Sequence, residues 1–208
     1  MRHEKKFRIQ DASLAEVQQV ILTHPSSFGV AFPNRIINSI YFDSADLGSF
    51  QQNQDGVSER VKYRIRWYGQ DLLVARSPQL EIKIRNNEFG KKEIVPLPNF
   101  ELDDDGALET IAKKYIPQEL MPKVITRYVR RYFVTQNQVL RATIDSGVSY
   151  YGFDGYHYNT TPTWDKAIIL ELKCKKEEVA FLAEVCQRIP FRIQKNSKYV
   201  NGVFATGS

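Results

Sequence analysis

The stretch RVKYRIRWYG, residues 60–69, decides the fold that the sequence predicts. Every second position in its first part is a cation: Arg60, Lys62, Arg64 and Arg66. Apolar or aromatic residues lie between these cations, and such an alternation is typical of a β-strand with one polar and one apolar face. Like charges along one face repel each other, and no acidic residue within the stretch relieves them. A bound polyanion would relieve that repulsion.

The same two-faced pattern recurs in most strands that the sequence predicts. We expect eight strands, at residues 2–9, 36–43, 58–68, 79–86, 91–95, 124–135, 139–149 and 167–175. Short connections between them favour antiparallel pairing. A hairpin is expected to turn at residues 87–90, and Pro25 and Pro33 are expected to bracket a loop.

About three helices are expected to flank these strands. Ser13 and Glu16 form a capping box ahead of the first helix. The second is expected from residue 103 to about 115, and the third from about 177 to 188. Ser197 is a candidate cap for a short helix near the end of the chain. The predicted fold class is therefore α+β and mostly β.

Composition restricts the class of protein and its partners. The chain has 208 residues, of which 42% are hydrophobic and 25% charged, which suits a single globular domain over residues 1–208. The net charge of +5 favours polyanionic partners. Cys174 and Cys186 give no metal-site or disulfide spacing. The first residues lack the apolar segment of a signal peptide, and no apolar run is long enough to span a membrane, so a cytoplasmic protein is expected.

Two interpretations of the charged faces remain open from the residues alone. The first is a sheet whose charged side meets water, as antiparallel sheets commonly have. The second is an eight-stranded antiparallel β-barrel whose charges point into a central tunnel and whose apolar outer face is covered by helices. Arginine and lysine hold phosphate oxygens, and carboxylates among them commonly hold a divalent metal. Such carboxylates occur at Glu4, Glu81, Asp145 and Glu171.

Several short motifs in one order along the chain resemble a known family. They are RHEKKF at the start, YFDS at 41–44, YRIRWYG at 63–69, LEIKI at 80–84, RYVRRYF at 127–133, LRATID at 140–145, LELK at 170–173 and SKY at 197–199. This series resembles the VTC domain, the catalytic domain of polyphosphate polymerases, which belongs to the CYTH-like triphosphate tunnel metalloenzymes. The resemblance implies an eight-stranded tunnel lined with Lys, Arg and Glu.

The resemblance also implies roles for individual residues. Candidate catalytic residues are Arg64, Arg66, Lys83, Arg130, Arg141 and Lys198, of which Arg64 and Arg66 match a pair on the transferred phosphoryl region. Candidate substrate-binding residues are Lys6, Lys92, Tyr128 and Ser197. Glu171 matches the metal-binding glutamate, and the implied cofactor is Mn²⁺ or Mg²⁺. The alternation of the strands independently supports Lys6, Arg64, Arg66, Lys83, Arg141 and Glu171, but it says nothing about Arg130.

The implied activity is an ATP-dependent polyphosphate polymerase that transfers the γ-phosphate of ATP to a growing chain. Phosphoryl transfer depends mostly on alignment and charge stabilisation, so no covalent nucleophile is required. One departure concerns the first strand, where simpler tunnel phosphatases carry Glu-x-Glu-x-Lys and this chain carries Arg2-x-Glu4-x-Lys6. The arginine removes one metal ligand, which argues against a two-metal hydrolase.

Two other functions stay open at the level of sequence. A metal-dependent tri- or polyphosphate hydrolase would use the same tunnel, and a non-catalytic module would only bind polyphosphate. Nucleic-acid binding is not expected, because the aromatic residues of the key strands alternate to the apolar side. The oligomeric state and a membrane-bound partner are left open. Individual residues also have structural alternatives: Arg64 and Arg66 as solvated cations, Glu171 as the partner of a lysine, Ser197 as a helix cap alone.

Overall fold

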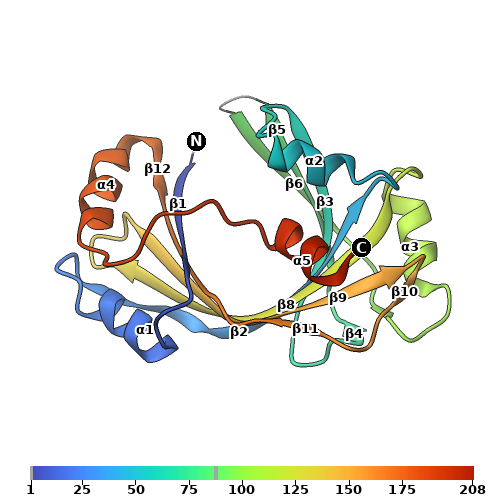
Figure 1. The fold of residues 1–208 in the computed structure, drawn as a ribbon, viewed down its shortest axis with the longest axis horizontal. Coiled ribbons are helices and arrows are strands. Elements are labelled where there is room, and N and C mark those ends of the chain that lie inside the picture. Colours follow the sequence, from blue (N-terminus) through green and yellow to red (C-terminus); the bar gives the residue numbers. More distant parts are fainter. Residues whose placement is uncertain (1, 87–88) are drawn as a thin grey trace. The chain divides into compact units, whose positions relative to one another are not determined.

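The computed structural model describes residues 2–86 and 89–208, and its ribbon is mostly β (Figure 1). The hairpin turn expected at residues 87–90 includes residues 87 and 88, which lie outside the described residues. The strands are β1 (Arg2–Ile9), β2 (Phe28–Asp43), β3 (Arg60–Tyr68), β4 (Val74–Ala75), β5 (Gln79–Asn86), β6 (Phe89–Pro96), β7 (Phe100–Glu101), β8 (Met121–Thr135), β9 (Arg141–Asp154), β10 (His157–Tyr158), β11 (Thr163–Asp165) and β12 (Ile168–Lys175).

Eight strands make up the main path of the principal sheet in the described part of the chain. Their order is β1-β12-β9-β8-β2-β3-β5-β6, and the short strands β10 and β11 pair with β9. The pairs β1–β12, β12–β9, β2–β3, β3–β5 and β5–β6 are all antiparallel. The antiparallel fold with eight principal strands confirms the predicted fold class. A separate small sheet pairs β4 with β7.

The helices are more numerous than the sequence predicts. Among residues 2–86 and 89–208 they are α1 (Leu14–Leu22), α2 (Gly48–Gln54), α3 (Ala107–Tyr115), the 3-10 helix η1 (Lys176–Glu178), α4 (Val179–Gln187) and α5 (Lys198–Thr206). The three expected helices are present as α1, α3 and α4, with the capping box of Ser13 and Glu16 at α1, and the candidate helix after Ser197 is α5. Helix α2 and the 3-10 helix η1 were not predicted. The sequence hides α2 because none of its residues is buried, so it has no apolar stripe.

The loop expected between Pro25 and Pro33 is another error. Strand β2 already begins at Phe28 and includes Pro33. Most residues from 29 to 35 are exposed, whereas residues 37–43 are buried. Proline is tolerated on an exposed edge of a sheet, because its missing N–H is not needed there. The exposed start of β2 therefore lacks the alternation that would have revealed it.

The chain divides into two compact units. Unit 1 comprises Met1–Arg35, Tyr128–Val148 and Asp165–Asn196; unit 2 comprises Ile36–Arg127, Ser149–Trp164 and Ser197–Ser208. The long strands β2, β8 and β9 each contribute residues to both units. The prediction of a single domain over residues 1–208 stays a prediction.

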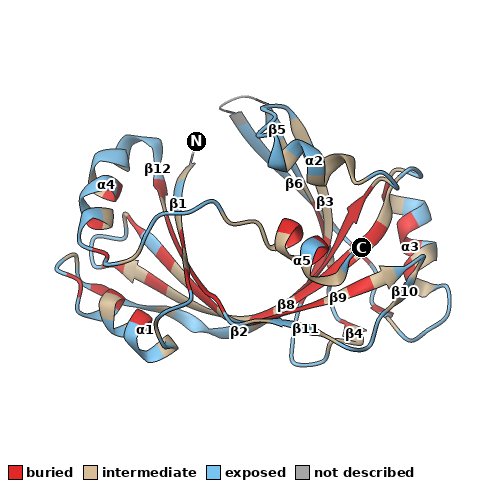
Figure 2. Cartoon of the chain, viewed as in Figure 1, coloured by how far each residue is buried: buried red, intermediate tan, exposed pale blue. Residues whose placement is uncertain are grey.

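In unit 1, one face of the strands packs against α1 and α4. Phe7 of β1, Leu170 of β12 and Ala142 of β9 are fully buried in this core, together with Val17 of α1 and Leu182 of α4. Lys6 and Glu171, whose side chains alternate with these, lie on the opposite face of the strands. Figure 2 shows the buried residues along β1 and β12 and on the inner side of these helices. Helices thus cover the apolar face, and the charged residues occupy the other.

In unit 2, the apolar face packs against α3 and the β4–β7 pair. Its core includes Trp67 of β3, Leu80 of β5, Phe100 of β7 and Ile111 of α3, all buried. Helix α5 lies on the other face, because Tyr199 of α5 stacks on Tyr41 with a centroid distance of 5.5 Å. The charged positions of RVKYRIRWYG share that second face. Within each unit, the alternation that the sequence predicts is therefore the alternation that the strands adopt.

Candidate functional site

In unit 2, the buried carboxylate of Glu81 in β5 contacts three cations. Glu81 lies opposite Arg64 of β3 and is only 3% exposed. Arg64 Nε donates to Glu81 Oε2 at 2.7 Å, and a second guanidinium nitrogen of Arg64 donates to the same oxygen. Lys92 Nζ lies 2.9 Å and Arg66 Nη1 3.6 Å from Glu81 Oε1. One negative charge faces three positive charges, so this face of the sheet keeps an excess of positive charge.

The cations hold Glu81 in its ionised form. Burial by itself would raise the pKa of the Glu81 carboxyl group. The charges of Arg64 and Arg66, with a hydrogen bond from Lys92, outweigh burial and lower that pKa to about 2. Glu81 is therefore a fixed negative charge at neutral pH, and it orients the two arginines by hydrogen bonds.

Two side chains of β2 fix the guanidinium groups from the other side. Arg64 Nη1 donates to the Tyr41 hydroxyl at 3.0 Å, and Arg66 Nε donates to Ser39 Oγ at 3.2 Å. Burial would raise the pKa of Tyr41, but the nearby charges of Arg64, Arg66 and Lys198 lower it to about 8. A tyrosine whose phenolate is stabilised in this way shows how strongly positive its surroundings are.

Three lysines lie side by side on β3, β5 and β6, two residues along the strands from the Arg64–Glu81 pair. Lys62 lies opposite Lys83, and Lys83 lies opposite Lys92. Lys92 shares a face with Glu81, whereas Lys91 lies opposite Ile84 and pairs with Glu93 at 2.7 Å. The register thus places Lys92, and not its neighbour, with the other cations. Lys83 itself is exposed.

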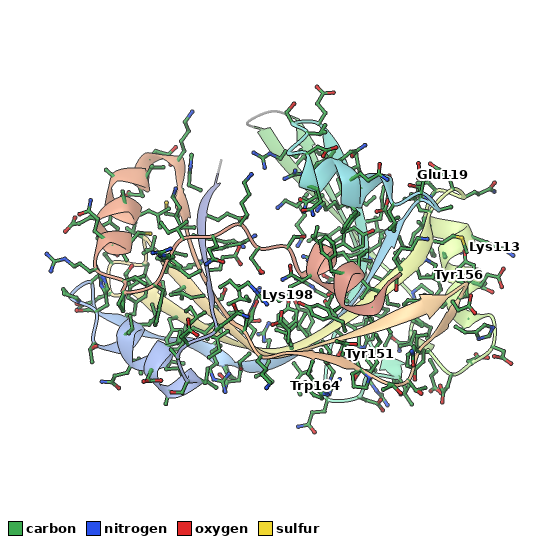
Figure 3. The ribbon with its side chains drawn as sticks, in the orientation of Figure 1. Lys113, Glu119, Tyr151, Tyr156, Trp164 and Lys198 are labelled. Atoms are coloured by element: carbon green, nitrogen blue, oxygen red, sulfur yellow. The ribbon has the colours of Figure 1, made fainter. Side chains whose placement is uncertain are left out.

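Helix α5 supplies two more of the predicted residues. Ser197 is its N-cap, and the Ser197 hydroxyl accepts a hydrogen bond from the backbone N–H of Val200 at 3.5 Å. Lys198 is its first residue, and Figure 3 labels this side chain at the start of the helix. Ser197 is therefore a helix cap, as its structural alternative expected. The start of a capped helix beside a lysine is also a favourable place for an anion to bind.

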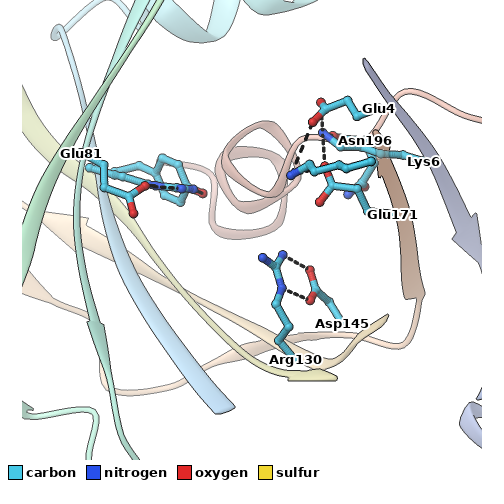
Figure 4. Close-up of polar contacts among 10 residues, drawn as sticks. Glu4, Lys6, Glu81, Arg130, Asp145, Glu171 and Asn196 are labelled. Carbon is cyan, nitrogen blue, oxygen red and sulfur yellow. Dashed lines mark hydrogen bonds and ion pairs between the residues drawn. The ribbon is translucent and has the colours of Figure 1, made fainter. Parts of the chain in front are cut away.

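A second cluster, in unit 1, alternates carboxylates and lysines across β1 and β12. Lys6 Nζ lies 3.0 Å from Glu4 Oε1 and 3.7 Å from Glu171 Oε1. Lys173 Nζ lies 3.0 Å from Glu171 Oε1 and 3.6 Å from Glu4 Oε2. Lys6 Nζ also donates to the backbone oxygen of Asn196 at 3.4 Å, as the close-up shows (Figure 4). Glu171 is only 7% exposed, so the two lysines pair with a carboxylate that water hardly reaches.

Arg130 of β8 forms a two-point ion pair in the same unit. Its Nε and Nη2 atoms donate to the two carboxylate oxygens of Asp145 at 2.6 and 2.7 Å (Figure 4). Burial would lower the pKa of Arg130, but Tyr128 and Asp145 raise it well above its usual value. Arg130 also lies 5.3 Å from the ring centre of the buried Tyr128. A bidentate pair of this kind fixes the direction of the guanidinium group.

Each predicted site residue lies in one of the two units. Unit 1 holds Lys6, Tyr128, Arg130, Arg141 and Glu171. Unit 2 holds Arg64, Arg66, Lys83, Lys92, Ser197 and Lys198. Arg141 begins β9 opposite Lys173 and is exposed. The two clusters contain Lys6 and Glu171 in unit 1 and Arg64, Arg66 and Lys92 in unit 2. Arg130 and Tyr128 lie together beside Asp145, Ser197 and Lys198 begin α5, and Arg141 and Lys83 are placed by the strand register. Their catalytic and binding roles stay predictions.

Comparison of the sequence with models of protein families identifies the family of this chain. The model of the VTC domain matches residues 1–206, which is nearly the whole chain. The chain belongs to the VTC domain family. Among curated proteins, no match was found. No helix within residues 2–86 and 89–208 has the length and apolar character needed to cross a membrane.

Solved structures show the same fold at low sequence identity. A protein from Pyrococcus horikoshii OT3 superposes with a TM-score of 0.55 and 9% identity, covering 97% of both chains. A putative adenylate cyclase from Vibrio parahaemolyticus has a TM-score of 0.55 and 12% identity, covering 96% of this chain and 97% of that one. A putative adenylyl cyclase from Hippeastrum, described as having a dominant triphosphatase activity, has a TM-score of 0.53 and 15% identity, with 99% and 97% coverage. These likenesses show that the chain shares its fold with these proteins, and the family match confirms the predicted VTC domain.

The family implies a divalent metal, and the donors in unit 1 of this VTC domain fit one. Glu4 and Glu171 both pair with Lys6 and with Lys173, so the two carboxylates lie in one cluster. Within the described ranges, no group of three or more His, Cys, Asp or Glu side chains could hold a metal. Mg²⁺ typically takes one or two carboxylates and completes its shell with phosphate oxygens and waters. Glu171, with Glu4 beside it, is therefore a suitable partial site.

Some residues of these clusters were given no role from the sequence. Lys173 alternates with Leu172 and so shares a face with Glu171, a signal that strand parity does contain. Tyr41 carries no such signal, because a tyrosine in an apolar run resembles a core residue. Arg8 and Asp165 form a bidentate pair at 2.8 and 3.0 Å, and only the fold brings these distant residues together.

Proposed function

We propose that this VTC domain is an ATP-dependent polyphosphate polymerase. The observation that carries the proposal is the buried Glu81, which meets three cations and leaves their shared face positively charged. Family membership and the triphosphate tunnel fold support a phosphate-handling function in general. The finer assignment to polymerisation rests on the family resemblance and on the cation-rich strands.

In this proposal, the arginine residues bind phosphoryl oxygens and the lysine residues bind the polyphosphate chain. Arg64 and Arg66, oriented by Glu81, Tyr41 and Ser39, hold the transferred phosphoryl region of ATP. Their planar guanidinium groups match the charge that spreads over phosphoryl oxygens in the transition state. In unit 1, Arg130, held by Asp145, and Arg141 are the arginines that bind phosphate oxygens. No side chain needs to act as a nucleophile, since a terminal phosphate oxygen of the acceptor attacks.

The remaining cations bind the chain and its acceptor end. These are Lys6, Lys83, Lys92 and Lys198, with Tyr128 and Ser197 beside them. Glu171, assisted by Glu4, would hold Mn²⁺ or Mg²⁺, which when bound neutralises charge on phosphate oxygens. Lysine suits the longer chain because a flexible ammonium group binds many phosphate geometries, whereas arginine suits a fixed one.

The partners in this proposal are ATP and polyphosphate, with no nucleic acid. Trp67 and Phe100 are buried in the core and not available for stacking on bases, whereas Phe32, Tyr68 and Trp164 are exposed. The cytoplasmic location stays a prediction.

The product of the reaction tests the proposal directly. Purified protein is incubated with ATP labelled at the γ-phosphate and with Mn²⁺, and the products are separated on a gel. The proposal predicts labelled chains that lengthen with time and disappear after digestion with a polyphosphatase. If labelled orthophosphate is the only product, the protein is a hydrolase and the polymerase proposal is refuted. Binding of ATP without any turnover would leave only a polyphosphate-binding module.

A further inference from the structure

Asp43, at the end of β2, is a buried carboxylate outside both ion-pair clusters. It is fully buried, with 0% exposure. Its Oδ1 accepts backbone hydrogen bonds from Ser44 at 2.9 Å and from Ser49 at 2.8 Å. Its Oδ2 accepts one from Phe50 at 2.9 Å and another from the hydroxyl of Tyr199. Because Ser49 and Phe50 lie in the first turn of α2, Asp43 satisfies N–H groups that the helix itself cannot.

Tyr199 joins this carboxylate to the face that carries the arginines. It is 2% exposed, and its ring stacks on that of Tyr41 at an interplanar angle of 24°. Burial and the hydrogen bond to Asp43 both raise the pKa of Tyr199, so its hydroxyl stays protonated and remains a donor. The hydroxyl of Tyr41 in turn accepts from Arg64 at 3.0 Å. A chain of direct contacts therefore runs from Asp43 through the two tyrosines to Arg64.

The same contact also fixes the start of α5. Tyr199 directly follows Lys198, and Ser197 caps the helix just before it. Tyr199 is thus the buried anchor of the turn that presents Lys198. Its hydroxyl reaches a carboxylate that three backbone N–H groups already hold in place, so the anchor point is rigid.

We propose that the Asp43–Tyr199 pair positions Lys198 and, through Tyr41, the guanidinium group of Arg64. Both members are positioning residues, since they lie behind the groups that would contact phosphate. The inference rests on the proposed function for its phosphate substrate, but the arrangement it describes exists without that substrate. The class of ligand is a tri- or polyphosphate, whose affinity depends on having these cations in register.

The competing explanation is that the pair only stabilises the fold. In that case the loss of the Tyr199 hydroxyl lowers the melting temperature and leaves phosphate affinity and KM unchanged. If the pair positions the cations, the loss also weakens phosphate binding in protein that is fully folded. The two explanations therefore differ in binding measured well below the melting temperature.

The test uses Tyr199→Phe, which keeps the stacked ring and removes only the hydroxyl. Tyr151→Phe is the control, because Tyr151 is another tyrosine of unit 2 but is only partly buried and packs against the α3 core. Amide hydrogen exchange of residues 198–206 is followed in unliganded protein, and tripolyphosphate affinity is measured by calorimetry. Hydrogen bonds to charged groups are strong enough that we expect about 10- to 100-fold faster exchange at the start of α5 in Tyr199→Phe. We also expect about tenfold weaker tripolyphosphate binding.

A second variant keeps the inference falsifiable. Asp43→Asn should weaken tripolyphosphate binding at least as much, because it also disturbs the backbone contacts of this carboxylate. The double variant should be little worse than Asp43→Asn alone, because the contact between Tyr199 and Asp43 is already broken. If Asp43→Asn does not fold, Tyr199→Phe alone decides the matter. Equal exchange and equal affinity in Tyr199→Phe and Tyr151→Phe would overturn the inference. If the wild-type protein makes no polyphosphate, the proposed function is refuted. The hydrogen-exchange and tripolyphosphate-binding measurements would still test whether Asp43 and Tyr199 position the cations.

Discussion

At the scale of single residues, Glu81 shows why an acidic side chain lies in an anion-binding surface. Three cations on adjacent strands would repel each other without it, so the unliganded protein needs an internal counterion. In the proposed function, phosphate oxygens compete for the same cations when substrate binds. Glu81 therefore takes, in the free protein, part of the role that the substrate takes in the complex.

Removing this counterion gives a first prediction. Glu81→Gln should destabilise the free protein by about 3 kcal/mol, because breaking a buried ion pair leaves charges uncompensated. Tripolyphosphate should raise the melting temperature of Glu81→Gln more than that of the wild type, since the anion replaces the lost charge. Thermal melts with and without tripolyphosphate measure both effects. An equal or smaller rise in the variant would show that the cations do not bind phosphate.

The same carboxylate predicts a pH dependence of stability. The folded-state pKa of Glu81 is about 2, below its usual 4.5, so its contribution to stability is present above pH 4.5. That contribution is lost as the pH falls from 4.5 to about 2. Denaturant titrations across this range should show a steeper loss in the wild type than in Glu81→Gln. Parallel curves for the two proteins would contradict the assignment.

Tyr41 predicts a pH dependence of substrate binding. The groups that face it are Arg64 and Arg66 of β3 and Lys198 and Tyr199 of α5. Its pKa is lowered to about 8, so above that pH its phenolate competes with phosphate for Arg64. The KM for ATP should rise above pH 8 in the wild type and stay flatter in Tyr41→Phe. A KM that changes with pH identically in both proteins would exclude this role.

At the scale of elements, the register of β6 separates two neighbouring lysines. Lys92 contacts Glu81, whereas Lys91 pairs with Glu93 on the other face. We expect Lys92→Met to weaken tripolyphosphate binding about tenfold, the effect of losing one charge-assisted hydrogen bond, and Lys91→Met to leave it unchanged. Calorimetric titration of the two variants checks this. The opposite ranking would mean that the strand faces are reversed.

The docking of α5 depends on a glycine. A Cβ atom on Gly202 would lie 2.8 Å from Val124 Cγ2 and 3.0 Å from Tyr150 Cδ1, so the helix or these side chains must move. Gly202→Ala should cost about 1–3 kcal/mol of stability and lower turnover by moving Lys198. Gly29→Ala is the control, because its added Cβ meets nothing within 4 Å. Urea unfolding and the ATP assay measure both effects, and equal results for the two variants would contradict this packing.

At the scale of the whole chain, strand parity determined most of what the sequence could predict. Alternation assigned Lys6, Arg66 and Glu171 to charged faces because a strand has only two faces. Helix α2 was missed because Asp43 holds it by backbone contacts and no apolar stripe marks it. The role of Tyr41 was also missed, because its partners come from other strands and from α5.

The central claim is that cations fixed on the strand faces carry out phosphoryl transfer, and Arg66→Gln tests it most directly. Arg66 is 7% exposed, and glutamine removes its charge without placing a second carboxylate beside Glu81. ATP turnover with Mn²⁺ is compared between Arg66→Gln and the surface variant Lys113→Gln, both shown to be folded by circular dichroism. The account predicts a loss of about 10²–10³-fold in turnover for Arg66→Gln and none for Lys113→Gln. Turnover within about threefold of wild type in folded Arg66→Gln would contradict the account.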